Sequence, residues 1–226
     1  MFPLRDENPS LTTPFVTRAL IVINVVVFVY ELTLGAGVNG FVAAFALVPR
    51  SFELALRGQE PLSAAAIPLF TSLFLHGGWM HLVGNMWYLW IFGDNMEDRL
   101  GHVWFAAFYL AGGVFAGLIH VFTNAGSNLP TVGASGAIAG VLGAYAAAFP
   151  RARVITLLPL FPVFPVVPIP ALFLLGFWFL MQFAIGTLTL GSSLSGGVAW
   201  WAHIGGFAFG YLVMLVVGAA SRKRRS

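Results

Sequence analysis

Long apolar runs separated by short polar segments dominate this sequence of 226 residues. Runs of about 20 apolar residues are long enough to cross a bilayer as helices. Six candidate spans run approximately over Thr17 to Leu34, Trp79 to Phe92, Asn95 to Phe122, Ser135 to Phe149, Ala171 to Leu190 and Val198 to Val217. The pattern therefore predicts an all-α integral membrane protein, a bundle of six transmembrane helices with a long loop between the first two.

The composition excludes a water-soluble domain. Hydrophobic residues make up 59% of the chain, charged residues only 8%, and the mean hydropathy is +0.89. The absence of cysteine rules out disulfides, cysteine-based zinc sites and a thiol nucleophile. The HExxH zinc motif is also absent, so we expect no metal and no organic cofactor.

The basic residues lie mainly on one side of the six-span arrangement. Arg50 and Arg57 fall on the side opposite the termini. The other nine bases share the side of both termini: Arg5, Arg18, Arg99, Arg151, Arg153 and the run Arg222-Lys223-Arg224-Arg225. The positive-inside rule then predicts cytoplasmic termini, and we expect the inner or plasma membrane of a prokaryotic cell. The terminal basic run indicates contact with a lipid surface rather than with nucleic acid.

The same pattern predicts the domain boundaries and the connections. We expect a cytoplasmic N-terminal tail at 1–16, a membrane domain at 17–218 and a basic cytoplasmic tail at 219–226. Gly93 is predicted to end the second helix, and Asp94 with Glu97 to cap the third. Segment 41–57 is predicted to be an amphipathic helix on the membrane surface. The prolines of segment 159–170 predict an extended connector.

A serine and a histidine are predicted to lie at the same depth in the membrane. Ser135 opens the fourth span and His203 the sixth, and each stands fourteen residues before the inner end of its span. At 1.5 Å per residue, each lies about 21 Å above the inner edge of a core about 30 Å thick, hence about 10 Å below the outer surface. Small residues at four-residue spacing, Gly136 with Gly140 and Gly206 with Gly210, favour close packing of these two helices.

The second span adds further polar groups. His81 and Asn85 are four residues apart and share a helix face, and His76 is expected at the lip of this helix, bonded to the loop. With the unpaired N–H groups at the start of the Ser135 helix, His81 and Asn85 form a candidate oxyanion hole. His102 and His120 are predicted to be interface residues without polar partners.

None of the eight acids is expected at the depth of Ser135 and His203. A full Ser-His-Asp triad is therefore not predicted. Serine hydrolysis would instead use a Ser135–His203 dyad, with neutral His203 accepting the hydroxyl proton and later delivering it to the leaving amine.

Four motifs in this order resemble the rhomboid family of intramembrane serine proteases. They are the His76, His81, Asn85 string, Gly93-xxx-Glu97-xxx-Gly101, Gly133-Ala134-Ser135-Gly136, and Ala202-His203-xx-Gly206-xxx-Gly210. The resemblance covers about Phe70 to Gly210 and implies a rhomboid-like six-helix bundle. It implies that Ser135 is the nucleophile, His203 the general base, and His81, Asn85 and the Ser135 N–H the oxyanion donors. Glu97 and Arg99 would be structural.

The resemblance also suggests a gate and shows two departures. Phe177, Trp178, Phe179 and Phe183 of the fifth span, with the loop 191–197, would move to admit a substrate helix from the lipid. Each aromatic residue is equally well explained as lipid-facing bulk. Many relatives carry a Trp-Arg pair where this chain has Ile67-Pro68, so the outer loop is expected to anchor differently in the interface. Some relatives carry a tyrosine that stacks on the catalytic histidine, where this chain has Ala139. An aromatic residue from a neighbouring span is expected to hold His203 instead.

The function predicted from the sequence is an endopeptidase that cleaves single-span membrane proteins near the outer end of their membrane helix. Favoured substrates would carry helix-weakening Gly or Pro near the cut. Two alternatives remain: a six-helix transporter or channel, and an inactive relative that escorts membrane proteins. The sequence predicts no oligomeric state.

Overall fold

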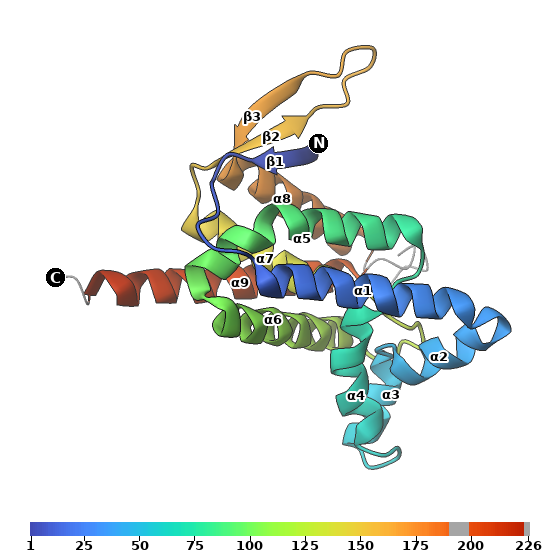
Figure 1. The fold of residues 1–226 in the computed structure, drawn as a ribbon. Helices are drawn as coiled ribbons and strands as arrows, with labels where there is room; N and C mark the ends of the chain where they lie inside the picture. The colour runs from blue at the N-terminus through green and yellow to red at the C-terminus, as the bar shows by residue number, and fades with distance from the viewer. Residues whose placement is uncertain (190–198, 224–226) are drawn as a thin grey trace.

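The computed structural model describes residues 1–189 and 199–223, with side-chain placement through residue 218. In this part of the chain, long helices lie side by side around a central one, and a small sheet projects from the bundle (Figure 1). The long helices are α1 (Phe15–Thr33), α5 (Trp79–Leu100), α6 (His102–Thr123), α7 (Ser135–Ala148), α8 (Ala171–Leu188) and α9 (Trp200–Lys223).

The helical membrane class predicted from the sequence is confirmed, but a count of six spans is not. Within the described residues, α1, α6, α8 and α9 are long and apolar enough to cross a membrane. The segment Ser63–Phe74 together with α5 would form a fifth span, bent by 79°. Helix α7 has only 14 residues, so it is short for a complete span.

The predicted boundary between the second and third helices is wrong. Helix α5 continues through Gly93 and ends at Leu100, and the following Gly101 has a φ of +80° that suits glycine. A Cβ on Gly93 would lie 2.9 Å from Cγ2 of Thr17, so this glycine lets α5 pack closely on α1. Glu97 does not cap its own helix. Its carboxylate accepts the backbone N–H groups of Val16 and Thr17 at the start of α1, both at 2.8 Å.

The long loop after α1 contains three short helices, α2 (Val38–Phe45), α3 (Pro49–Leu56) and α4 (Ser63–Thr71). The single amphipathic helix predicted for segment 41–57 is therefore wrong. The chain breaks between α2 and α3, where Leu47 forms an isolated bridge with Thr131 and Pro49 begins a new helix. This bridge ties the loop to the segment just before α7.

The predicted extended connector between α7 and α8 is instead a paired hairpin. Strand β2 (Arg153–Leu157) pairs antiparallel with β3 (Val166–Pro170) and, on its other edge, with β1 (Phe2–Asp6). The N-terminal residues are thus fixed to the bundle. Tyr145 of α7 donates to Oδ2 of Asp6 at 2.5 Å, and burial raises the pKa of the Asp6 carboxyl above its ordinary value.

Helix α7 forms the core of the bundle, because residues 136–146 are all buried. It contacts α5, α6, α8 and α9, and its composition of Gly and Ala lets their backbones come close. A Cβ on Gly206 would lie 2.1 Å from the carbonyl oxygen of Gly136, and one on Gly210 would lie 1.8 Å from that of Gly140. No side chain fits at either position without moving the two helices apart.

We predict that Gly210→Ala destabilises the bundle by at least about 1–3 kcal/mol, the usual cost of overpacking, because the new methyl group meets backbone rather than a movable side chain. Thermal unfolding in detergent micelles measures the change. Gly176→Ala on α8 is the matched control, since a Cβ there has no neighbour within 4 Å. Equal melting temperatures for the two variants would contradict this packing.

Candidate active site

A cavity of about 710 Å³ opens beside the N-terminal end of α7. Residues of α5, α6, α7, α8 and α9 line it, together with the segment 130–133 that leads into α7. Among the described residues, the lining contains no carboxylate. Its titratable side chains are those of His81, Tyr88, His120 and His203.

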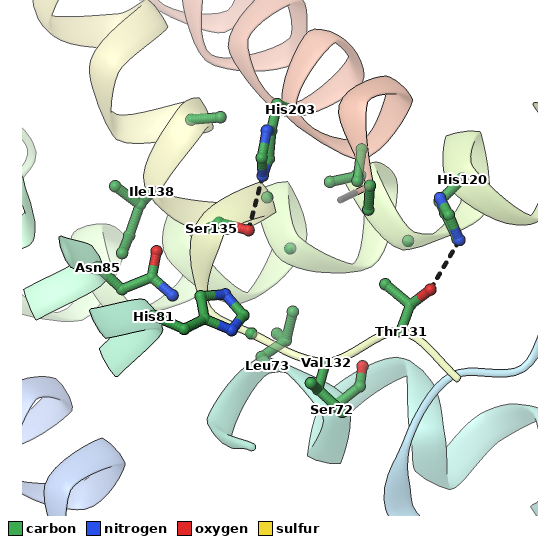
Figure 2. Close-up of a pocket in the computed structure, with 18 of the residues that line it drawn as sticks. Ser72, Leu73, His81, Asn85, His120, Thr131, Val132, Ser135, Ile138 and His203 are labelled. Carbon is green, nitrogen blue, oxygen red and sulfur yellow. Dashed lines mark hydrogen bonds between the residues drawn. The ribbon is translucent and has the colours of Figure 1, made fainter. Parts of the chain in front are cut away.

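Ser135 and His203 are in direct contact in this cavity. Ser135 Oγ lies 2.8 Å from His203 Nε2, and Figure 2 marks this bond between α7 and α9. Ser135 is the first residue of α7, and its hydroxyl does not cap the helix. The close approach at Gly136 and Gly206 brings the first turns of the two helices together. The two side chains predicted to share a depth therefore meet.

The other nitrogen of the imidazole is also bonded. His203 Nδ1 lies 2.7 Å from Oε1 of Gln182, a buried side chain of α8. The Trp178 ring, one turn earlier on α8, lies with its centroid 5.9 Å from that of His203. The aromatic neighbour predicted for His203 is therefore present, whereas Gln182 was not predicted, although a lone glutamine in an apolar span was the available signal.

His81 and Asn85 approach the same point from α5. Figure 2 shows both on the side of Ser135 opposite His203. A Cβ on Gly133 would lie 2.6 Å from His81 Nε2 and 3.6 Å from Asn85 Nδ2, so both side chains point at the turn before Ser135. Gly133 has a φ of +122°, and its N–H donates to the Ser72 carbonyl at 2.8 Å. Glycine at this position allows the turn and leaves room for the two donors.

His76 is buried and contacts side chains of α5, rather than bonding only the loop. Its Nε2 lies 3.1 Å from Asn85 Nδ2, and its ring packs edge-on against His81 with centroids 5.1 Å apart. The backbone N–H of His76 lies 3.3 Å from both carboxylate oxygens of Glu31, a buried residue of α1. An acid therefore lies closer to the site than the sequence suggested, although no carboxylate among the described residues lines the cavity. Glu31 contacts the turn that carries His76, although it does not reach His203.

The predictions for His102 and His120 are also wrong, because both have polar partners. His102 Nδ1 lies 2.5 Å from Oε1 of Glu97. His120 is buried and lines the cavity, with Nε2 2.7 Å from Thr131 Oγ1 (Figure 2) and Nδ1 3.2 Å from Asn124 Nδ2. The four-residue spacing of His120 and Asn124 on one helix was a usable signal. Thr131 was not foreseeable, because it comes from the following loop.

The four aromatic residues proposed as a gate lie on different faces of α8. Phe177 and Phe183 are exposed, as expected for side chains that face lipid. Trp178 lines the cavity, and Phe179 packs on Phe207 of α9 with ring centroids 4.8 Å apart. The loop 191–197 named with them lies outside the described residues.

Comparison with curated proteins finds rhomboid relatives in several eukaryotes. Rhomboid protein 1, mitochondrial, of Saccharomyces cerevisiae is 30% identical over 172 residues, 74% of this chain and 46% of that protein. Presenilin-associated rhomboid-like protein A, mitochondrial, of Danio rerio is 41% identical over 96 residues, 41% of this chain and 25% of that protein. RHOMBOID-like protein 5 of Arabidopsis thaliana is 37% identical over 76 residues, 34% of this chain and 25% of that protein. The matches span between a quarter and just under half of these relatives.

These relatives overturn the predicted location. The sequence predicted a prokaryotic inner or plasma membrane with cytoplasmic termini, whereas the yeast and zebrafish relatives are named as mitochondrial proteins. That prediction is therefore wrong. Its weakness was that the positive-inside rule compares the two sides of a membrane and carries no information about which membrane it is.

The strongest comparison is with a family model described as the Rhomboid domain, which matches residues 63–220. The matched segment is more than two thirds of the chain and contains α4 through most of α9. Ser135, His203, His81, Asn85 and Gln182 all lie within it. The chain belongs to the rhomboid family.

Proposed function

We propose that this protein is a serine endopeptidase that cleaves single-span membrane proteins within the bilayer. Members of the rhomboid family are generally intramembrane serine proteases, although some are inactive. One observation carries the proposal for this member: the 2.8 Å contact between Ser135 Oγ and His203 Nε2 in a cavity between membrane helices. An inactive escort has no need of a serine hydroxyl bonded to an imidazole.

In the proposed reaction, Ser135 Oγ attacks the carbonyl carbon of the scissile peptide while its proton passes to His203 Nε2. The tetrahedral intermediate expels the amine, which takes the proton from His203, and an acyl-enzyme ester remains on Ser135. Water then attacks the ester carbonyl with His203 again as base. This step releases the new carboxyl end and restores the serine hydroxyl.

The negative charge on the intermediate requires hydrogen-bond donors in the cavity. His81 and Asn85 point at the turn that precedes Ser135, and the first N–H groups of α7 have no acceptor within the helix. We therefore assign His81, Asn85 and the Ser135 N–H as oxyanion donors. Loss of one such donor costs about 100-fold or more in rate in serine proteases. His76 supports this set by contacting Asn85.

The substrate must present an unpaired carbonyl to Ser135. Inside an intact helix the carbonyls are already hydrogen-bonded, so favoured substrates carry Gly or Pro near the cut and a small residue just before it. The curated relatives named as mitochondrial make a mitochondrial membrane the compartment in which to look for them.

We predict that purified protein reacts with a fluorophosphonate probe, because only an activated serine is nucleophilic enough to do so. Ser135→Ala and His203→Ala should each remove the labelling seen by in-gel fluorescence. Ser63→Ala, at an exposed position on α4, is the control and should label normally. Labelling that survives Ser135→Ala would contradict the assigned nucleophile.

We further propose that the substrate helix reaches the cavity sideways, between α5 and α8. Met80 and His81 of α5 and Trp178 and Gln182 of α8 line the same cavity. Helix α8 packs mainly on α7 and α9. Its displacement from α5 therefore breaks few contacts. Phe177, Trp178, Phe179 and Phe183 would then move with α8 as the gate opens.

Crosslinks between α5 and α8 should abolish cleavage of a membrane-spanning substrate but preserve fluorophosphonate labelling, because the small probe needs no lateral opening. The chain has no cysteine, so a pair with one member on α5 and the other on α8 can be introduced cleanly and joined across the cavity mouth with a reducible bifunctional thiol reagent. Reduction of the crosslink should restore cleavage. Undiminished cleavage by a fully crosslinked pair would exclude this route.

A further inference from the structure

The catalytic imidazole has a second polar contact for which the dyad has no role. His203 Nδ1 lies 2.7 Å from Gln182 Oε1, while Nε2 faces Ser135. The Gln182 side chain is only 8% exposed, in the middle of an apolar helix. Burying an amide in such surroundings is unfavourable unless it is hydrogen-bonded, so this contact has a cost that a leucine would avoid.

The contact determines which imidazole nitrogen carries the proton. An amide oxygen can only accept, so the proton of neutral His203 lies on Nδ1. Nε2 then has a free lone pair directed at the Ser135 hydroxyl, as a general base requires. The other tautomer would present an N–H group to Ser135 and could not accept its proton.

No carboxylate is available for this task. Among the described residues lining the cavity, the titratable groups besides His203 are His81, Tyr88 and His120, none of which is an acid that could bind Nδ1 as an anion. Gln182 therefore occupies the position that an aspartate holds in a Ser-His-Asp triad. A neutral amide avoids burying a negative charge in the membrane.

We propose that Gln182 is a positioning residue that holds His203 in its reactive tautomer and orientation. The inference rests on the proposed function and deepens it. Trp178, four residues earlier on α8, contacts the same ring, so one face of α8 holds the imidazole from two points. Any displacement of α8 would therefore release His203 as well as open the cavity.

The experiment measures the rate of fluorophosphonate labelling of the full chain against pH for two variants. Gln182→Leu keeps the size but removes the acceptor, and should lower the maximal labelling rate by about 100-fold with little change in probe affinity. Gln182→Glu keeps an acceptor and should restore much of the rate. It should also move the acidic limb of the pH profile to higher pH, because a carboxylate stabilises the protonated imidazole.

Met181→Leu, at the neighbouring half-exposed position, is the matched control and should behave as wild type. A labelling rate for Gln182→Leu within threefold of wild type would overturn the inference, as would an unmoved acidic limb in Gln182→Glu.

If Ser135→Ala also labels, the proposed function has failed. If Ser135→Ala is silent while Gln182→Leu is normal, only the role of Gln182 has failed. Melting temperatures of both variants show whether a lost labelling rate comes from misfolding. Recovery of the rate in Gln182→Glu shows that Gln182 acts by positioning His203 and not by packing alone.

A separate observation concerns the hairpin of β2 and β3, whose tip projects away from the helices (Figure 1). Its connecting segment is entirely apolar, and Leu160, Phe161, Val163 and Phe164 are 59%, 90%, 63% and 54% exposed. Hairpin tips in water usually carry Gly, Asn or Asp, and this one has none. From Val154 to Ser221 the sequence contains no Asp, Glu, Lys or Arg.

The free edge of β3 is also poor in hydrogen-bond donors. The N–H of Leu158 donates to the Pro165 carbonyl, and the N–H of Ala171 donates to the Ala152 carbonyl. Pro165, Ala171 and every second residue between them therefore direct their backbone polar groups toward β2. Pro168 and Pro170 therefore face outward, where proline has no N–H group to leave unpaired. Unpaired donors are costly in lipid, and their removal makes this edge compatible with an apolar surrounding.

We infer that the hairpin tip inserts into the lipid at the headgroup boundary. The occupant of this surface is lipid rather than protein because β3 runs directly into α8, whose exposed face is itself apolar, so the two surfaces are continuous. Arg151 and Arg153 lie at the base of the hairpin, where they can meet lipid phosphates.

A single cysteine tests this in the otherwise cysteine-free chain. Phe161→Cys is labelled with a nitrobenzoxadiazole fluorophore and reconstituted in phosphatidylcholine–phosphatidylglycerol vesicles with brominated acyl chains. Its emission should be quenched several-fold, whereas the same label at Leu11→Cys, exposed near the N-terminus, should be unaffected. Equal quenching of the two labels by the brominated lipid would overturn the inference. So would protection from quenching that grows with protein density, since a second copy would then cover the tip.

Discussion

Two helix backbones in van der Waals contact are the constraint on which the rest of the site depends. Helices α7 and α9 meet through glycines whose missing side chains leave space only for the opposing carbonyl groups. This contact brings the first turns of both helices together, and with them Ser135 and His203. Any wider spacing would separate the hydroxyl from the imidazole. The geometry of the proposed dyad and the stability of the fold therefore depend on the same few small residues.

Polar groups in this bundle occur in bonded chains rather than singly. Glu31 contacts the His76 turn, His76 contacts Asn85, and Asn85 faces the turn before Ser135. On the other side of Ser135, His203 continues to Gln182. In a medium with little water, each unpaired group would cost several kcal/mol, roughly the whole benefit of burying a large apolar side chain. Hydrogen bonding offsets the cost of burying these groups and fixes their orientation before a substrate binds.

The sequence was sufficient for features that depend on distance along one helix. Counting fourteen residues from each inner end put Ser135 and His203 at one depth, and four-residue spacing put His81 and Asn85 on one face. Contacts between helices far apart in the chain were harder to foresee. Glu31 was missed because nothing local indicates which face of α1 turns inward. Gln182 stood out as a lone glutamine in an apolar span, but its partner His203 lies on another helix, so the contact itself was not foreseeable. Gly93 was misread as a terminator because a packing glycine and a terminating glycine look alike in sequence. The β-sheet was missed because its pairing joins the first residues of the chain to residues 153–157.

In the proposed function, Ser135, activated by His203, breaks a peptide bond inside the membrane. The most direct measurement incubates the purified chain in liposomes with a single-span substrate carrying Gly and Pro near the outer end of its helix, and identifies the products by mass spectrometry. The wild-type chain should make one cut near that end, and both Ser135→Ala and His203→Ala should leave the substrate intact. An intact substrate with the wild-type chain, or the same cut with Ser135→Ala, would contradict the proposed function.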